Sequence, residues 1–372
     1  MVKLFFTLCS IFFLNTIYAQ DKTNNKNLVN PIFSKIEKTS LNYGFKMDGY
    51  WIWCGSVIKG EDGYYHMFAS RWDKKYPFHP GWMIASEIVR AKSKTPEGPF
   101  IFEEVVLAAR GAQYWDGRAT HNPSITKFGN EYVLYYMGTT HPFNDPIPEN
   151  LDLNSPETIV SRSNKRIGIA TSKSINGPWK RLDSPILETK PNTFYSFLTS
   201  NPAPFINNDG SAYLIFKGRS YLKKFPYQSI QKIGIAKAKH YLDKYEVQNN
   251  EHTIFDSNSI GEVEDPYLWI DDNGFHLLVK DMGIKLSGEH HAGILLHSPD
   301  GIDWKLDNNP KAYSRTLKLL NNESITMGQL ERPFILFENG KPRCLYFATM
   351  DGNGGFQNST SSWNIAIPLN ID

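Results

Sequence analysis

Four side chains that can transfer a proton stand beside apolar, strand-like segments. His121, Glu264 and Glu331 each begin such a segment, whereas His141 follows one that ends near residue 136. Histidine suits a general base because its ordinary pKa is close to neutral, and glutamate suits the protonation of a departing oxygen. We therefore expect His121, or else His141, as the base, with Glu264 and Glu331 as acids. In the competing interpretation, His121 is a hydrogen-bonded structural histidine and the glutamates cap loops or pair with Arg332.

Basic and polar residues gather at the same kind of position. Arginine forks bind a carboxylate or a sulfate through two-point contacts, and an indole ring can stack on a sugar face. The expected substrate-binding residues are Trp53, Arg71, Arg118, Asn122, Asn201, Lys217, Arg219, Asp265 and Arg332. Alternatively, about half of these charges are ordinary surface residues and the tryptophan packs between sheets.

A cationic pocket in a nearly neutral chain favours an anionic ligand; for a sugar, which the resemblance described below implies, this means a uronate or a sulfated residue. In a uronic acid the hydrogen on C5 lies beside the carboxylate, and neutralising that carboxylate lets a base remove the hydrogen. The substituent on C4 then leaves, and a 4,5-unsaturated ring remains. If the departing oxygen carries a sugar, the enzyme is a lyase. If it is a free hydroxyl at a non-reducing end, the enzyme is a dehydratase.

An internal repeat supplies the elements that must position these residues. Residues 121–136 predict a strand, a Gly-Asn turn and a second strand with alternating apolar residues. Four other segments follow the same template. The equivalent positions in the five copies are Gly55, Pro123, Pro202, Pro266 and Pro333, which are spaced by 68, 79, 64 and 67 residues. Similar intervals that recur in this way indicate a repeat architecture.

The repeat predicts an all-β, five-bladed β-propeller with four-stranded antiparallel blades. A third strand is expected in each copy, and Pro-Gly turns after two of these strands lead to an outer fourth strand. The expected third strands are residues 83–86, 167–171, 233–236, 293–296 and 363–366. An aromatic content of 14% and 22 prolines suit many short strands, and no segment has the sustained period of a long helix.

The first residues predict a signal peptide. Lys3 precedes an apolar run over residues 4–14, which is too short to span a bilayer, and a polar stretch ends at Ala19. We expect cleavage near Ala19, a periplasmic or secreted protein, an N-terminal extension at 20–44 and one propeller domain at 45–372. The remaining chain of about 353 residues has a formal charge of +1, so neither nucleic acid nor a membrane is expected as a partner.

Cysteine and histidine usage predicts neither a disulfide framework nor a metal site. Cys54 and Cys344 fall in the first and last copies, which are ring neighbours, so they are either paired or two buried free thiols. His290 and His291 lack the spaced carboxylate or cysteine that would complete a metal site. No cofactor is expected.

Over residues 45–370, the chain resembles the five-bladed propeller glycosidases of family 43 and their relatives. The resemblance rests on the x-x-Pro that opens the innermost strands and on IGIATSKS at 167–174 followed by GPW at 177–179. It implies three carboxylates around the axis, including a base on blade one and a general acid on a later blade. Blade one instead reads Trp53-Cys54-Gly55, and Asp48 lies five residues upstream of Trp53.

At a finer level the chain is similar to the propeller oligosaccharide dehydratases of marine Bacteroidota that act on ulvan oligomers. The similar segments are WDGRATHNPSI at 115–125, GTTHPF at 138–143 and GEVEDP at 261–266. This similarity implies elimination of water from the non-reducing-end uronic acid of an anionic oligosaccharide. One alternative is an exo-acting glycoside hydrolase that uses Glu264 with Glu331 or Asp48, and another is a non-catalytic sugar-binding propeller.

Overall fold

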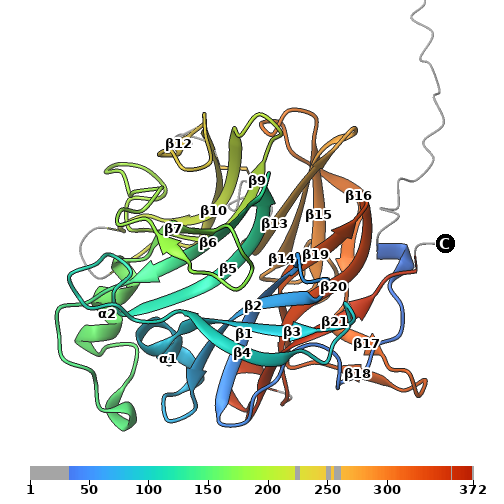
Figure 1. The fold of residues 1–372 in the computed structure, drawn as a ribbon, viewed down its shortest axis with the longest axis horizontal. Helices are drawn as coiled ribbons and strands as arrows, with labels where there is room; N and C mark the ends of the chain where they lie inside the picture. Colours follow the sequence, from blue (N-terminus) through green and yellow to red (C-terminus); the bar gives the residue numbers. More distant parts are fainter. Residues whose placement is uncertain (1–32, 223–226, 249–252, 255–260, 353, 371–372) are drawn as a thin grey trace, which may run out of the picture.

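Five antiparallel sheets surround a common axis in the computed structural model, which describes residues 33–222, 227–248, 253–254, 261–352 and 354–370 (Figure 1). The innermost strands form a closed circle of contacts in the order β1 (Tyr50–Lys59), β5 (Ala119–Phe128), β9 (Leu198–Ile206), β13 (Val263–Asp271) and β19 (Gln329–Glu338). The predicted all-β, five-bladed propeller is therefore confirmed. The signal peptide predicted at 1–19 lies outside the described residues. Within those residues, no helix is long and apolar enough to cross a membrane.

Each blade continues outward from its innermost strand through antiparallel neighbours. Blade one adds β2 (Tyr65–Asp73), β3 (Glu87–Ser93) and β4 (Ile101–Leu107), and blade two adds β6 (Glu131–Thr139), β7 (Arg166–Ser172) and β8 (Lys180–Arg181). Blade three adds β10 (Ala212–Arg219), β11 (Lys232–Ala238) and β12 (Glu246–Val247), and blade four adds β14 (Gly274–Asp281), β15 (Gly293–Ser298) and β16 (Lys305–Tyr313). Blade five adds β20 (Lys341–Met350) and β21 (Ser362–Pro368).

The N-terminal segment closes the ring on blade five. Ile36 and Phe45 form bridges with Leu369 and Asn364 on the side of β21 that faces away from β20. Phe45 is 1% exposed and lies in the apolar core between blades five and one. The start of the described chain therefore occupies the outer position of the last blade. A separate hairpin, β17 (Thr316–Lys318) and β18 (Ser324–Thr326), lies between blades four and five in the sequence.

The predicted third strand of blade one is wrong. Residues 83–85 belong to helix α1 (Phe78–Ala85), and the third strand is β3, which begins at Glu87. A short apolar run fits a strand or a buried helix equally well, and here it packs as a helix against α2 (Pro156–Ser163) (Figure 1). The other four third strands are confirmed as parts of β7, β11, β15 and β21. The remaining helices are the 3-10 turns Phe33–Lys35, Pro148–Asn150 and Gly355–Gln357.

Apolar side chains fill the space between each pair of neighbouring blades. Five large clusters lie between blades one and two, two and three, three and four, four and five, and five and one. Cys344 belongs to the last of these clusters, and both Cys54 and Cys344 are buried free thiols. The disulfide alternative is therefore not realised. Packing between adjacent sheets explains how the described residues fold around one axis.

One backbone feature repeats in all five innermost strands and directs side chains toward the axis. A residue with a positive φ interrupts the strand register near its start, and these residues are Cys54 (55°), Asn122 (54°), Asn201 (55°), Asp265 (59°) and Arg332 (54°). Such a bulge re-aims the side chain that it carries. Asparagine and aspartate accept this conformation readily, whereas cysteine and arginine do so less often. We call the face at which the innermost strands begin the start face.

Candidate active site

The five bulge residues form a hydrogen-bonded chain around the axis, which we call the axial ring. Cys54 Sγ donates to Asn122 Oδ1 at 3.0 Å, Asn122 Nδ2 to Asn201 Oδ1 at 3.0 Å, and Asn201 Nδ2 to Asp265 Oδ1 at 3.3 Å. Arg332 Nε lies 3.0 Å from Asp265 Oδ1. Burial raises the pKa of the Cys54 thiol to about 12, so the thiol remains a donor. Four predicted substrate-binding residues, Asn122, Asn201, Asp265 and Arg332, therefore meet in the axial ring, where their side chains bind one another.

The channel beyond the axial ring is narrow. Its free volume is about 40 Å³, and it is lined by Cys54, Asn122, Asn201, Arg332 and the residues that follow them. A sugar ring cannot pass through a space of that size. The channel therefore gives the axial ring no wide opening on the side opposite the start face.

Beside the ring, buried lysines bind buried carboxylates. Lys280 Nζ lies 3.1 Å from Glu264 Oε2, 3.3 Å from Asp265 Oδ2 and 2.6 Å from Glu331 Oε1. Lys217 Nζ donates to Glu264 Oε1 at 2.5 Å. We call these five residues the lysine–carboxylate cluster. It brings together both predicted acids and the predicted ligand Lys217, because second strands end where innermost strands begin.

The pKa values of the two glutamates in this cluster are shifted in opposite directions. Burial raises the pKa of Glu331 to about 7, and the negative charges of Asp265 and Glu264 add to this effect against the opposing charge of Lys280. Burial also acts on Glu264, but Lys217, Lys280 and Arg332 together hold its pKa well below its ordinary value. At neutral pH, Glu264 is therefore an ionised carboxylate, and Glu331 is close to half protonated.

A group of cations borders Glu264 on the side away from Lys280. Arg219 donates to Ser229 O at 2.7 Å and to Gln231 Oε1 at 3.0 Å, and it lies 3.9 Å from Glu262. Burial lowers the pKa of Lys165 well below its ordinary value, and the charges of Lys217, Arg162 and Arg219 act in the same direction. We call Arg162, Lys165, Lys217 and Arg219 the cationic group. Even with Lys165 neutral, the charges of Arg162, Lys217 and Arg219 outnumber the carboxylates of Glu262 and Glu264.

Aromatic rings from α1 and β5 pack beside the cationic group. The Trp82 and His121 rings are stacked with their centroids 4.8 Å apart, and Lys165 Nζ lies 4.2 Å from the centroid of the Trp82 ring. Trp82 Nε1 donates to His79 Nδ1 at 2.9 Å. Desolvation and the nearby charges of Lys165 and Arg162 lower the pKa of His79 to about 4, although this residue is exposed. His79 is therefore neutral at physiological pH, with its proton on Nε2.

His121, the predicted base, is covered by the Trp82 ring and is 3% exposed. Its Nδ1 is 2.8 Å from Ser86 Oγ, and its Nε2 is 3.7 Å from Cys54 Sγ. Burial lowers the pKa of His121 well below its ordinary value, and Arg332 and Lys165 contribute to the shift. Both ring nitrogens thus have protein partners. This arrangement matches the alternative of a hydrogen-bonded structural histidine better than that of a proton acceptor.

His141 and Arg118 lie together under the insertion between β6 and β7. Arg118 donates to the backbone oxygens of His141 and Phe143 and to Asp145 Oδ1 at 2.8 Å. His141 is 1% exposed, stacks on Phe143 and has no hydrogen-bond partner for either ring nitrogen among the described residues. These contacts therefore join the pair to the insertion and not to Glu264 or the cationic group.

Arg71 and Trp53 also have protein partners. Arg71 pairs with Glu87 at 2.8 Å, and its guanidinium lies between the rings of Tyr50 and Phe102, on the innermost and outermost strands of blade one.

The Trp53 ring packs edge-on against Phe78 and at a tilt against Phe356 in the 3-10 turn at 355–357. Asp48, the alternative base, is exposed. The structure thus brings neither Arg71 nor Asp48 into the lysine–carboxylate cluster.

The site includes residues that the repeat did not reveal. His79 and Trp82 come from the segment between β2 and β3, and Arg162 and Lys165 come from the segment between β6 and β7. The repeat gave no signal for the first segment, whereas the longest repeat interval, 79 residues from Pro123 to Pro202, marks the insertion that holds the second. Within the described ranges, no three His, Cys, Asp or Glu side chains converge as a metal-binding group.

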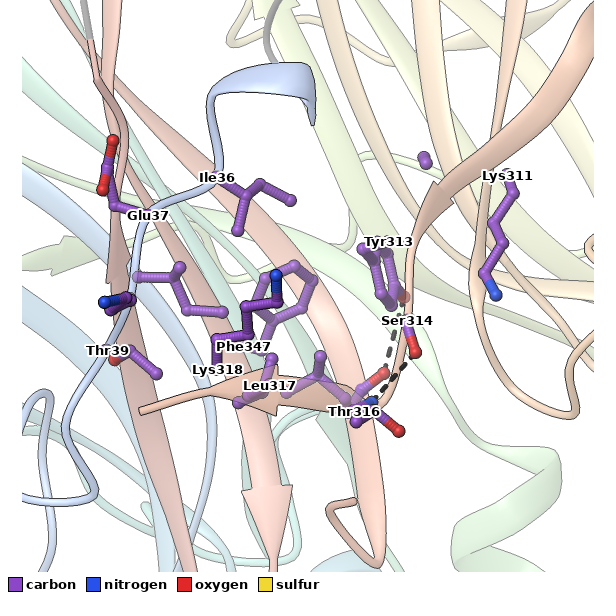
Figure 2. A pocket seen from close by; sticks show the side chains of 14 residues that line it. Ile36, Glu37, Thr39, Lys311, Tyr313, Ser314, Thr316, Leu317, Lys318 and Phe347 are labelled. Carbon is purple, nitrogen blue, oxygen red and sulfur yellow. Dashed lines mark hydrogen bonds between the residues drawn. The ribbon is translucent and has the colours of Figure 1, made fainter. Parts of the chain in front are cut away.

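A second cavity, of about 530 Å³, lies between the N-terminal segment and blades four and five (Figure 2). Apolar side chains such as Ile36, Leu317 and Phe347 line it together with polar ones that include Lys311 and Lys318. It shares no lining residue with the axial ring, the lysine–carboxylate cluster or the cationic group. The concentration of charge therefore distinguishes the start face as the candidate active site.

No family model and no curated protein matches the chain. Among solved structures, Zg3597, a family 117 glycoside hydrolase from the marine bacterium Zobellia galactanivorans, is 16% identical with a TM-score of 0.59, over 90% of this chain and 89% of that one. BT0996, solved as an RGII complex, is 12% identical with a TM-score of 0.62, over 91% and 92%. A thermostable family-43 glycoside hydrolase is 11% identical with a TM-score of 0.59, over 90% and 94%. The chain is therefore a five-bladed β-propeller with the fold of the family 43 and family 117 glycoside hydrolases.

Proposed function

We propose that the protein is an exported carbohydrate-active enzyme that eliminates water from the non-reducing-end uronic acid of anionic oligosaccharides such as ulvan fragments. The observation that carries this proposal is the excess of buried positive charge beside Glu264. Arg162 forms no ion pair with a described carboxylate, and Lys217 and Arg219 lie near it around Lys165. A partly buried charge without a partner is costly, and an anionic ligand would remove that cost.

The cationic group would bind the carboxylate of the uronate. Arg162 and Arg219 present planar guanidinium groups, which suit a carboxylate, and Lys217 adds a point charge held by Glu264 at 2.5 Å. Neutralising the carboxylate stabilises the negative charge that develops at C5 as its proton leaves. The axial ring limits how far the sugar can enter, so the terminal residue would be the one that reacts.

Elimination fits the carboxylates of this site better than inverting hydrolysis does. Glu264 and Glu331 both bind Lys280, at 3.1 and 2.6 Å, so these two oxygens lie within about 6 Å of each other. Inverting glycosidases separate their two carboxyl groups by about 6.5–9.5 Å to admit a water molecule. Blade one contributes Cys54 to the axial ring, where the resemblance to family 43 implies a carboxylate base.

Retaining hydrolysis is the second candidate. Its two carboxyl groups lie about 5–5.5 Å apart, which the positions of Glu264 and Glu331 allow. Their pKa values are also pushed apart, with Glu331 raised to about 7 and Glu264 held well below its ordinary value, as an acid and a nucleophile require. Against this candidate, the Lys280 ammonium occupies the space between the two carboxyl groups.

The test is to incubate the purified chain with uronate-ended ulvan oligosaccharides while absorbance and product mass are recorded together. New absorbance from a conjugated enol ether, with loss of one water and no shortening, supports elimination. Shorter products without new unsaturation support hydrolysis. A neutral oligosaccharide of matched length is the control, and turnover of this control at a similar rate would contradict the role of the cationic group. Recovery of the natural protein from the periplasm or medium would test the proposed export.

A further inference from the structure

We propose, on the basis of the proposed elimination reaction, that Lys165 is the catalytic base that takes the C5 proton of the uronate. Lys165 lies between α2, which ends at Ser163 with Asn164 as its C-cap, and β7, which begins at Arg166, so a helix and a strand fix its place in the chain. Its backbone oxygen accepts a hydrogen bond from Thr199 N at 3.3 Å. Its side chain reaches the Trp82 ring, which covers His121. The amine is therefore held at the covered end of the site.

Three buried lysines share this region, and their partners separate their roles. Lys280 contacts three carboxylates and Lys217 contacts Glu264, so both have counter-charges that favour the ammonium form. Lys165 is 6% exposed and forms no ion pair within the described part of the chain; its contact with the Trp82 indole favours the ammonium, but no carboxylate binds the amine. A lysine buried without a counter-charge favours the neutral amine, whose lone pair can accept a proton.

The groups that face Lys165 come from five elements. They are His79 from α1, His121 from β5, Arg162 from α2, Lys217 and Arg219 from β10, and Glu264 from β13. Glu264 is the single carboxylate among them, and it is already bound by Lys217 and Lys280. The pKa of Lys165 lies well below its ordinary value because burial and the surrounding cations together outweigh Glu264. His79 and His121 are neutral, because the pKa of each is lowered by burial.

The proposed step is balanced in atoms and electrons. The Lys165 amine forms a bond to the C5 proton, and the electrons of the broken C5–H bond become the C4–C5 double bond. The C4–O bond breaks, and its electrons leave with the oxygen. The ammonium formed at Lys165 returns the proton to this oxygen, which departs as water. Lys165 thus ends the cycle as the neutral amine, and no further reactant is needed.

Substitution distinguishes a base from a carboxylate anchor. Lys165→Arg keeps a positive charge but cannot accept a proton at working pH, and Lys165→Gln removes both properties. For a base, both variants lose about 10²–10⁴-fold in kcat, while Lys165→Arg retains a KM close to that of the natural chain. The pH limb that reports deprotonation of the amine also disappears. Lys173→Gln, at an exposed lysine near the far end of β7, is the matched control. A Lys165→Arg variant that keeps kcat and its pH profile would overturn the proposal.

A second measurement does not depend on turnover. NMR titration of the lysine amines, with Lys165→Arg used for assignment and its folding checked by circular dichroism, should show one amine that deprotonates well below the others. Titration of Lys165 together with the surface lysines would overturn the proposal even if the natural chain removes water from uronates. If the chain instead cleaves oligosaccharides with uptake of water, the proposed function fails and the base role fails with it, whatever the amine titration shows.

Discussion

The ammonium of Lys280 lies 2.6 Å from the carboxylate of Glu331, and both side chains are buried, with 2% and 6% of their areas exposed. The same ammonium contacts Glu264 and Asp265, so one lysine compensates three carboxylates on two blades. Removing the lysine would leave buried negative charge without a partner. Lys280 therefore stabilises the contact between blades four and five and also sets the charge beside the two candidate acids.

Lys280→Met is expected to lower the free energy of unfolding by about 3–5 kcal/mol, because it breaks a buried ion pair from one side. Denaturant unfolding measures this change. Lys341→Met, at an exposed lysine that begins the neighbouring strand β20, is the control and should change stability by less than about 0.5 kcal/mol. Equal effects of the two substitutions would contradict the assigned role of Lys280.

Glu331→Gln is expected to change how stability depends on pH. The pKa of Glu331 is raised from 4.5 to about 7 by burial, so the folded chain binds this proton more tightly than the unfolded chain does. The contribution of Glu331 to stability is therefore complete below about pH 4.5 and is lost as the pH rises to about 7. Glu331→Gln should remove this loss, on the order of 1–3 kcal/mol, from unfolding curves recorded across that range. If the free energy of unfolding changes with pH in the same way for Glu331→Gln and the natural chain, the predicted contribution of Glu331 is refuted.

The axial ring makes a prediction about backbone strain. Asn122 has a φ of 54°, accepts from Cys54 and donates to Asn201. Asn122→Ala and Asn122→Gly both lose these hydrogen bonds, but alanine must also adopt a left-handed conformation. The alanine variant should be less stable than the glycine variant by about 1 kcal/mol, as measured by thermal unfolding. A glycine variant that is equally unstable would show that strain contributes nothing.

His121→Asn tests whether this histidine transfers protons or supports its neighbours. Asparagine can still bond Ser86 but has no basic nitrogen and no ring to stack beneath Trp82. With Lys165 as the base, kcat should fall by about tenfold or less, through loss of support for Trp82. Steady-state kinetics with uronate-ended oligosaccharide measures the effect. A loss as large as that of Lys165→Gln would return the role of base to His121.

Two arginines should differ in their effect on substrate affinity. Arg219 belongs to the cationic group, whereas Arg71 is paired with Glu87 and enclosed by Tyr50 and Phe102. Arg219→Gln should raise KM for a uronate-ended substrate by about tenfold or more, because a charged hydrogen bond contributes about 1.5–3 kcal/mol. Arg71→Gln should leave KM unchanged. The reverse order would place the substrate over blade one instead.

The propeller was predictable because its signal recurs five times. Each copy carries a turn between two strands and a proline or glycine at one place, so errors in single strands leave the blade count intact. The error at residues 83–86 shows the limit, because three apolar residues and a serine do not specify a period, and α1 forms where this segment packs against α2.

The site was only partly predictable, because only some of its residues occupy positions that recur in the repeat. Glu264, Asp265, Glu331, Arg332 and Lys217 occupy repeat positions, and the structure brings them together. Trp82 and Lys165 come from single insertions, and only tertiary packing places the amine 4.2 Å from the indole. Arg71 and Arg118 also lie at strand ends, but they form ion pairs with Glu87 and Asp145. Strand position thus indicates which end of a blade a residue occupies but not which way its side chain points.

The most direct test of the central claim is to run the reaction in water enriched in heavy oxygen, with a uronate-ended ulvan oligosaccharide, and to weigh the carbohydrate products. Elimination predicts one product that has lost a single water, carries one new double bond and contains no heavy oxygen. Hydrolysis instead gives shorter products, one of which has gained a heavy oxygen from solvent. Incorporation of the label with no unsaturated product would contradict the account.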